Sequence, residues 1–268
     1  MKTPSKFFYR KLITSFLLSV MIVFLINGES YGQPPKISTT LAKSQLESVR
    51  YTKLARTELQ ENFNAAKALE YAIIATDLDH ENDRGYFLKA RAEHRLGNNE
   101  VALKDYNKCI ELWDEEFLYF VDRAQLFSEL KRYPEAFNDY TKAIKLTKDP
   151  DDLDYIYLNR AQLKVEVLDW VGGLEDCNMA LTYNSVNNSS SFALRGKIKY
   201  ELQDYLSALN DCDKSIQISP GFDAVTYYTR GLIKIKLGKS ESACADFNKA
   251  SEIRKDFRIA LAIQKHCQ

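Results

Sequence analysis

Few side chains in this sequence could perform acid–base or metal chemistry. Its three histidines are His80, His94 and His266, and none is paired with another histidine or a cysteine at the spacing of a zinc site. The sequence also contains no glycine-rich phosphate loop and no Gly-x-Ser-x-Gly stretch, which are signatures of nucleotide-binding proteins and serine hydrolases. We therefore predict that the chain is not an enzyme and that it uses no metal or cofactor.

Charged side chains do recur at a fixed spacing. Five times a basic residue is followed sixteen residues later by an aspartate: Lys89 and Asp105, Arg123 and Asp139, Arg160 and Asp176, Arg195 and Asp211, Arg230 and Asp246. Such a row could form a charged stripe for a ligand. It could also form ion pairs that fix the register of two antiparallel helices, and we favour this structural interpretation because the two positions would lie nearly opposite each other.

The elements that would carry these charges repeat along the chain. Pairs of small residues seven apart occur six times, with first members 34 to 37 residues apart: Ala68/Ala75, Ala102/Cys109, Ala136/Ala143, Gly173/Ala180, Ala208/Ser215 and Ala243/Ala250. Apolar residues recur around them at helical spacing, and short turns such as Leu96-Gly97-Asn98 separate two helices in each unit. Each unit is thus predicted to be a helical hairpin that must stack on its neighbours to bury its apolar face.

These offsets resemble those of tetratricopeptide repeats. The small residues, an aromatic residue after the turn (Tyr133, Trp170, Tyr205) and the period carry the resemblance, from about residue 49 to residue 256. The resemblance implies an all-α, right-handed superhelical solenoid of about six helical hairpins with a C-terminal capping helix. It also implies a non-catalytic scaffold that binds a peptide or a partner protein in a concave groove lined by the first helix of each hairpin.

Carried over by register, the resemblance places aromatic, aliphatic and basic side chains in this groove. The expected partner-binding residues are Phe87, Arg91, Arg95, Val121, Gln125, Tyr155, Leu158, Gln162, Lys197, Tyr200, Val225, Tyr228, Leu232, Ile235 and Lys236. Val225, Tyr228, Leu232 and Ile235 form an apolar stripe along one helix face, and we expect this stripe to anchor the partner. Alternatively, the C-terminal helix from Lys255 folds across the stripe and buries it.

The repeat pattern also sets the expected boundaries. Six units span residues 49–82, 83–116, 117–153, 154–188, 189–223 and 224–256, and a capping helix follows at 257–268. Residues 33–48 contain Pro34 and Pro35 and are typical of a linker or an exposed arm.

The five cysteines leave at least one thiol unpaired, because their number is odd. Cys177 and Cys212 occupy equivalent places in successive units. Stacked helices lie about 8–10 Å apart, whereas a disulfide needs Cα atoms within about 7 Å, so this pairing is disfavoured. Cys109 stands where other units carry alanine, and we interpret the cysteines as buried packing residues. A disulfide between Cys244 and Cys267 remains open.

The first 32 residues differ from the repeats. Basic residues precede an apolar run from Leu12 to Ile26, and the small residues Ser30 and Gly32 precede Gln33, which is the pattern of a secretory signal peptide. The fifteen residues of this run give about 22 Å of helix, against about 30 Å for a bilayer core. We therefore expect cleavage and export to the periplasm or the exterior. The alternative is that residues 12–26 stay uncleaved and anchor an assembly factor or chaperone-like adaptor in the membrane.

Net charge narrows the class of partner. Lysine plus arginine and aspartate plus glutamate each total 37, so the chain is formally neutral, and removal of residues 1–32 makes it mildly acidic. We therefore expect a peptide or protein partner. We expect no nucleic-acid partner, and no stable membrane association once the signal peptide is cleaved.

Overall fold

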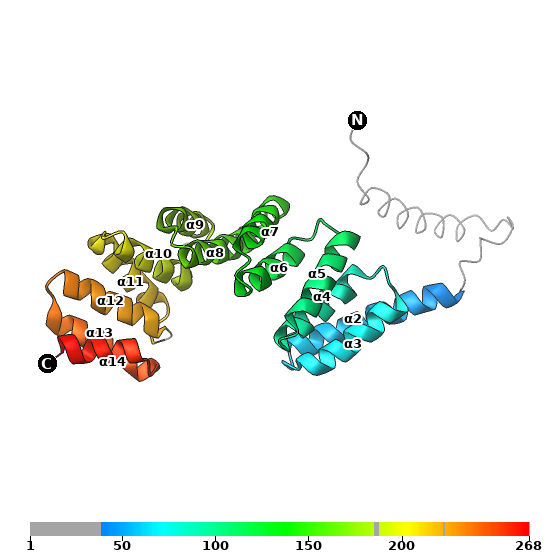
Figure 1. The fold of residues 1–268 in the computed structure, drawn as a ribbon, viewed down its shortest axis with the longest axis horizontal. Helices are drawn as coiled ribbons and strands as arrows, with labels where there is room; N and C mark the ends of the chain where they lie inside the picture. Colours follow the sequence, from blue (N-terminus) through cyan, green and yellow to red (C-terminus); the bar gives the residue numbers. More distant parts are fainter. Residues whose placement is uncertain (1–38, 185–187, 222, 268) are drawn as a thin grey trace, which may run out of the picture. The chain divides into compact units, whose positions relative to one another are not determined.

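A computed structural model describes residues 39–184, 188–221 and 223–267 of the chain. Within these ranges the chain forms α-helices and no strand (Figure 1). The helices are α2 (Thr39–Gln60), α3 (Ala65–Leu78), α4 (Asp83–Arg95), α5 (Asn99–Leu112), α6 (Phe117–Glu129), α7 (Tyr133–Leu146), α8 (Pro150–Glu166), α9 (Trp170–Tyr183), α10 (Ser189–Glu201), α11 (Tyr205–Ile218), α12 (Ala224–Lys236), α13 (Ser240–Ile253) and α14 (Phe257–His266). The expected signal peptide lies outside the described residues.

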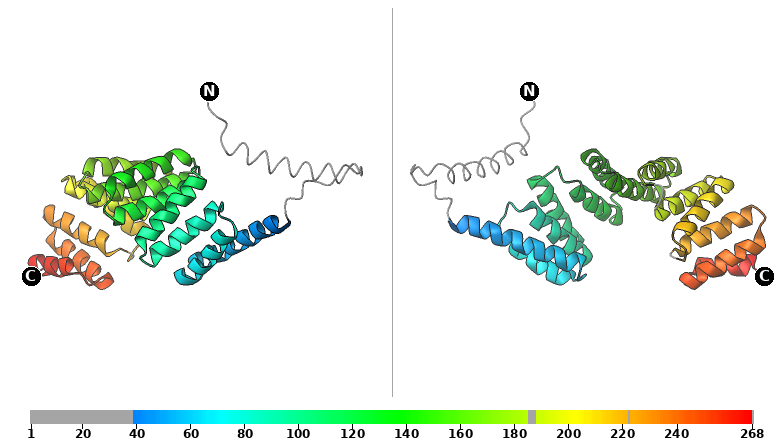
Figure 2. Two further views of the ribbon diagram at one scale, coloured as in Figure 1. Left: turned by 45° about the vertical axis from the view of Figure 1, so that its right-hand side comes forward. Right: turned by 180° about the vertical axis from the view of Figure 1, so that it is seen from behind.

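Consecutive helices pair into hairpins, and the hairpins stack in chain order. The pairs are α2 with α3, α4 with α5, α6 with α7, α8 with α9, α10 with α11 and α12 with α13. The second helix of each hairpin packs against the first helix of the next, and the views of Figures 1 and 2 show these neighbours side by side. The predicted all-α helical solenoid is therefore confirmed.

The small residues of the repeat lie where helices cross. Ala102, Ala136 and Ala208 are fully buried at these crossings. A Cβ atom on Gly196 would lie 2.9 Å from the Sγ atom of Cys212, and one on Gly231 would overlap the buried ring of Phe247. The repeat therefore requires small side chains because two helix backbones approach each other at these positions.

The turn within each hairpin ends the first helix with a residue in the left-handed region. Gly97 and Gly238 have φ angles of 82° and 73°, and Leu168 occupies the same conformation with φ of 63°. An aspartate often follows, as in α9, where the side chain of Asp169 accepts a hydrogen bond from the backbone N–H of Gly172. The left-handed residue thus ends the first helix, and the side-chain cap begins the second.

Two helices begin earlier than the repeat pattern indicated. Helix α2 starts at Thr39, so the second half of the expected arm at 33–48 is helical, and Ser48 is buried with its hydroxyl donating to the carbonyl of Ala75 at 2.6 Å. Helix α8 starts at Pro150, because the Asp149 side chain caps it and proline is tolerated in the first turn. The extra residues of this unit therefore lengthen a helix and not a loop.

Candidate partner-binding site

The row of basic residues and aspartates forms ion pairs within the hairpins. Arg123 donates from Nε and Nη2 to the two carboxylate oxygens of Asp139 at 2.7 and 2.8 Å. The same two-bond geometry joins Arg160 to Asp176, Arg195 to Asp211 and Arg230 to Asp246. The aspartates of these pairs are buried, so the row fixes hairpin register, as the structural interpretation held.

Each arginine of the row also makes two contacts that the sequence analysis did not identify. The free Nη1 atom donates to a polar side chain on the preceding hairpin: Asn107, Thr141, Asn178 or Asp213, at 2.7 to 3.3 Å. The guanidinium also lies over the aromatic ring three residues earlier: Phe120, Tyr157, Phe192 or Tyr227. An aromatic residue at this fixed offset was the signal in the sequence, and each arginine thereby ties two hairpins together.

Two adjoining clefts lie beside the first helices α10 and α12. The first, here the hydroxyl cleft, has a volume of about 380 Å³; it is lined by Gln162, Ser189, Ser190, Ala193, Leu194, Lys197, Ser215, Ile216, Ser219, Asp223, Val225, Thr226, Tyr227 and Thr229. The second, here the α14 cleft, has a volume of about 360 Å³; it is lined by Lys197, Tyr200, Glu201, Val225, Tyr228, Thr229, Leu232, Arg254, Asp256, Arg258 and Ile259. The two clefts share Lys197, Val225 and Thr229, so they adjoin at these residues, and together they are called the recess.

Lys197 is the cation at the junction of the clefts. Its side chain is half-buried and has no hydrogen-bond or ion-pair partner among the residues that the structure describes. Lys199, two residues further on, differs because its Nζ atom pairs with Asp211 at 2.7 Å. The positive charge of Lys197 therefore remains available to a ligand.

Six of the residues expected at the partner site line these clefts. They are Gln162, Lys197, Tyr200, Val225, Tyr228 and Leu232. Tyr200 is half-buried, and burial raises the pKa of its phenol. The structure thus brings the C-terminal part of the expected set together.

The N-terminal part of the expected set is used mostly for internal contacts. Phe87 and Val121 are 7% and 0% exposed, so their expected place on an open groove is wrong. The reason is close packing of neighbouring first helices, in which the ring of Phe87 lies 4.7 Å from that of Tyr119. Arg91 pairs with Asp122 at 2.9 Å, and Arg95 donates to the carbonyl of Leu59 at 2.7 Å.

The remaining expected residues are more open. Gln125 donates to the hydroxyl of Tyr155 at 2.7 Å, and Tyr155 itself is 46% exposed. Leu158 is half-buried and Lys236 is exposed, and neither lines the two clefts.

The apolar stripe on α12 is partly covered by the C-terminal helix. Tyr228, Leu232 and Ile235 pack against a cluster that contains Phe247 of α13 and Ala262 of α14. The stripe is therefore not open along its length, and the C-terminal helix covers it in part without burying it. The spacing of the apolar residues on α12 could not decide how far the stripe is covered, because the cover comes from a segment that follows the repeats. Tyr228 and Leu232 still line the α14 cleft.

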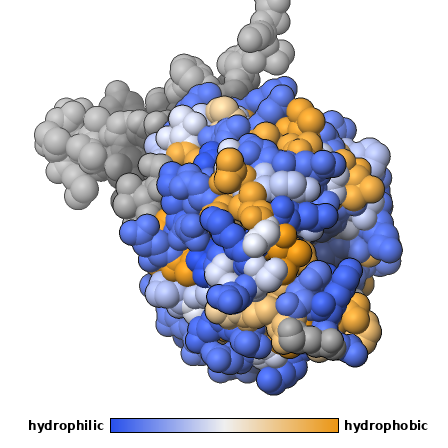
Figure 3. All heavy atoms as spheres, turned by 90° about the vertical axis from the view of Figure 1, so that its left-hand side faces the viewer, coloured by the Kyte–Doolittle hydropathy of each residue, from blue (hydrophilic) through white to orange (hydrophobic). Residues whose placement is uncertain are grey.

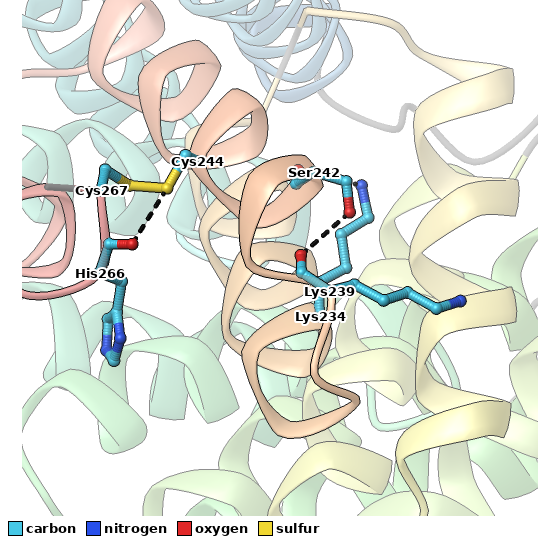
Figure 4. Close-up of a disulfide and its surroundings, with 6 residues drawn as sticks. All are labelled: Lys234, Lys239, Ser242, Cys244, His266 and Cys267. Carbon is cyan, nitrogen blue, oxygen red and sulfur yellow. Dashed lines mark hydrogen bonds between the residues drawn. A yellow bond between two sulfur atoms is a disulfide. The ribbon is translucent and has the colours of Figure 1, made fainter.

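A disulfide fixes α14 in this position. Cys244 of α13 is joined to Cys267, which directly follows α14, with the Cα atoms 5.5 Å apart (Figure 4). Cys109, Cys177 and Cys212 are free and buried, which confirms the packing interpretation for these three. Burial raises the pKa of the thiols of Cys177 and Cys212 to about 12, so they are protonated and unreactive at neutral pH.

The end of the molecule that carries α14 has a mixed surface. Figure 3 shows apolar patches there between hydrophilic side chains. Phe257 and Leu261 of α14 are 80% and 50% exposed, whereas Ile259 of the same helix is 2% exposed. Helix α14 is therefore amphipathic, with its buried side toward the last hairpin.

The described part of the chain offers neither a cluster of metal ligands nor a helix that could span a membrane. Residues 39–184, 188–221 and 223–267 contain no group of three or more histidine, cysteine, aspartate or glutamate residues arranged to hold a metal ion. Across the same ranges, none of the helices combines the length and the apolar character needed to cross a bilayer.

Comparisons with known proteins agree with this geometry. The family model described as tetratricopeptide repeat matches residues 83–112 and 224–257, which correspond to α4 with α5 and to α12 with α13. No curated protein matches the chain in sequence.

Solved structures share the fold at low sequence identity. Pseudomonas aeruginosa PilF has a TM-score of 0.74 and 16% identity, over 83% of this chain and 99% of PilF. YrrB, described as a TPR protein with an unusual peptide-binding site, has a TM-score of 0.57 and 20% identity, over 74% of this chain and 99% of YrrB. A chain of the APC/C hetero-tetramer Cut9–Hcn1 has a TM-score of 0.70 and 13% identity. The match covers 86% of the present protein but only 46% of the Cut9–Hcn1 chain, which is longer.

The family model thus matches the second and the last hairpin, and the intervening hairpins repeat the same small residues and the same arginine–aspartate pairs. The structures that share the fold include a protein described as a TPR protein. This chain therefore contains tetratricopeptide repeats, and its fold is the helical solenoid of a protein-interaction scaffold.

Proposed function

We propose that this chain is an exported, non-catalytic scaffold that binds a segment of a partner protein along α10 and α12. The observation that carries the proposal is the recess formed by the adjoining hydroxyl cleft and α14 cleft, with the unpaired Lys197 at their junction. Apolar side chains such as Val225 and Leu232 alternate there with hydroxyl and charged groups, a mixture that suits an extended segment of a partner protein.

The distribution of internal contacts supports this location. In the N-terminal hairpins, the side chains expected to face a partner are buried, as Phe87 is, or form internal ion pairs, as Arg91 does. In the C-terminal hairpins, Gln162 is exposed and Tyr200 and Val225 are half-buried, so these side chains can contact a bound segment. The description of YrrB as having a peptide-binding site supports binding of this kind on the same fold.

Photo-crosslinking from single sites tests the binding proposal. A photoreactive amino acid at Gln162 or Tyr200 lies in the recess, whereas one at Glu175, exposed on the second helix α9, serves as the control. We expect both recess sites to crosslink to the same partner protein in producing cells, and the control site to give none of that product. Equal crosslinking yields from all three sites would show that the partner does not bind specifically in the recess, and would overturn the proposal.

Export is the second component of the proposal, supported by the signal-peptide pattern of residues 1–32 and by the Cys244–Cys267 disulfide. Disulfides persist in oxidising compartments and are rare in the cytosol. N-terminal sequencing of the mature protein tests this component. A start near Gln33 supports cleavage and release, whereas an intact Met1 in the membrane fraction supports the anchored alternative.

A further inference from the structure

We infer that the bound segment carries an internal acidic side chain next to a large apolar one, with the carboxylate on Lys197 and the apolar group in the α14 cleft. This inference rests on the proposed function and adds the chemistry of the ligand to it.

Lys197 differs from the other half-buried lysines of the C-terminal first helices. Lys164, Lys199 and Lys234 each pair with a buried aspartate at 2.7 to 3.0 Å. Lys197 is half-buried but lacks such a partner within the described residues. Its ammonium group thus has no opposite charge in that part of the chain, and a ligand carboxylate would supply one through a charge-assisted hydrogen bond.

The charges that line the α14 cleft also favour an acidic ligand. The cations are Lys197, Arg254 and Arg258, against the carboxylates of Glu201 and Asp256. Asp256 is already engaged by both arginines, at 3.5 Å from Arg254 and 3.1 Å from Arg258. Since the cations outnumber the carboxylates, an additional carboxylate improves the charge balance of the cleft.

The walls of the α14 cleft provide the apolar contact. Tyr228 and Leu232 of α12 face it from one side, and Ile259 of α14 closes it from the other. These side chains are held in place by the packing of α14, which the disulfide fixes. A large aliphatic or aromatic side chain of the partner would find a preformed pocket there, which lowers the entropic cost of binding.

The recess extends on both sides of Lys197, so an internal acidic residue fits better than a chain terminus. On the side away from α14, the hydroxyl cleft offers Ser189, Ser190 and Ser215 as hydrogen-bonding groups. Hydroxyl groups can donate to and accept from the backbone of an extended segment without selecting its side chains. The bound segment therefore continues past the lysine in both directions.

Fluorescence anisotropy with three synthetic peptides tests the inference on the mature, disulfide-bonded protein. The peptides have blocked termini and differ only in whether glutamate, glutamine or lysine precedes a leucine–phenylalanine pair. We expect the glutamate peptide to bind at least tenfold more tightly than the glutamine peptide, which corresponds to about 1.4 kcal/mol. Lys197→Met should remove this preference, and Lys197→Glu should shift it to the lysine peptide.

Lys236→Met is the matched control. Lys236 lies on α12, is exposed and lines neither cleft, so its loss should leave the glutamate preference intact. If the three peptides bind equally well, and Leu232→Ser still weakens the binding of each, that result would overturn the acidic component and leave the proposed function standing. A glutamate preference that survives Lys197→Met would also overturn the inference, as would tighter binding of a peptide with a free C-terminal carboxylate and no glutamate.

Absence of binding by every peptide would overturn the inference as well. In that case the crosslinking experiment decides the proposed function independently. Recess crosslinks would show that a partner with other chemistry binds there, and their absence would remove the proposed function together with the inference.

Discussion

Lys89 is the residue at which the row of ion pairs is weakest. Its Nζ atom reaches only one oxygen of Asp105, at 3.3 Å, and the second carboxylate oxygen is buried without a partner in the described part of the chain. Burial raises the pKa of Asp105, and Lys89 only partly opposes this effect. A buried acceptor without a donor costs about 1–3 kcal/mol of stability.

We therefore predict that Lys89→Arg stabilises the fold by about 1 kcal/mol at neutral pH, because arginine can bond both oxygens as it does in the other four pairs. The raised pKa means that the folded chain binds the Asp105 proton more tightly than the unfolded chain does, so stability falls as pH rises through that pKa. The advantage of the variant should therefore be small in acid and grow toward neutral pH. Thermal unfolding of both proteins across this pH range measures it.

The reverse exchange, Arg123→Lys, is the matched control. It removes one of two bonds to Asp139, the bond to Asn107 and the stacking on Phe120, so we expect destabilisation by about 1–2 kcal/mol. If both exchanges destabilise the protein equally, the geometry of the guanidinium group is not what distinguishes the pairs.

Ser191 carries the other buried polar atom without a partner among the described residues. The equivalent residue of the next hairpin, Thr226, donates its hydroxyl proton to Asp223 at 2.6 Å. We predict that Ser191→Ala leaves stability unchanged or raises it, whereas Thr226→Ala lowers it by about 1 kcal/mol, because only threonine loses a satisfied hydrogen bond. Urea unfolding of the two variants checks this, and a clear loss in Ser191→Ala would reveal a bonded hydroxyl.

At the scale of helices, the sequence predicted what depends on local spacing. The period of the small residues located the hairpins, and the offset of sixteen residues located the pairs such as Arg160 with Asp176, because both follow from the geometry of two adjacent helices. The start of α8 at Pro150 was missed because the repeat period placed the unit boundary at residue 154, although proline is compatible with the first turn of a helix.

The candidate site was only partly predictable for a related reason. Periodicity identifies which side chains share a helix face, but not what covers that face. Phe87 and Tyr228 occupy equivalent places on α4 and α12, yet Phe87 is buried against the next first helix and Tyr228 borders a cleft. Their exposure differs because it depends on the neighbouring helices, which the sequence of a single repeat does not specify. The Cys244–Cys267 disulfide stayed undecided because it depends on how α14 docks.

Reduction of that disulfide should act on one element and not on the whole array. The bond closes a loop between residues 23 apart, and removal of such a constraint costs about 3 kcal/mol. Since each hairpin contacts only its neighbours, we predict that a dithiol reductant lowers hydrogen-exchange protection in α13 and α14 and leaves α4 to α9 unchanged. Cys267→Ser should reproduce the effect without reductant. Uniform loss of protection would contradict a local role.

At the scale of the molecule, α14 completes the stack by covering the last hairpin. Ile259 and Ala262 are buried against that hairpin, although the outer side of α14 remains open. An array of hairpins needs such a cap because the apolar face of its last member would otherwise meet water. The same cap forms one wall of the α14 cleft, so the stability of the C-terminal end and the shape of the proposed binding site depend on one helix and one disulfide.

If the chain is exported as proposed, Cys244 and Cys267 should be oxidised in the exported protein and reduced in a variant that stays in the cytosol. Protein exported through the signal peptide should contain the Cys244–Cys267 disulfide, while a variant without residues 2–26 should stay in the reducing cytosol with all thiols free. Alkylation after denaturation, without reductant, should then add three labels to the exported protein, at Cys109, Cys177 and Cys212, and five to the retained variant. Mass spectrometry counts the labels. Exported Cys267→Ser, with four labels, is the control. Five labels on the exported protein would show that the bond does not form there and that the wall of the α14 cleft is held by packing alone.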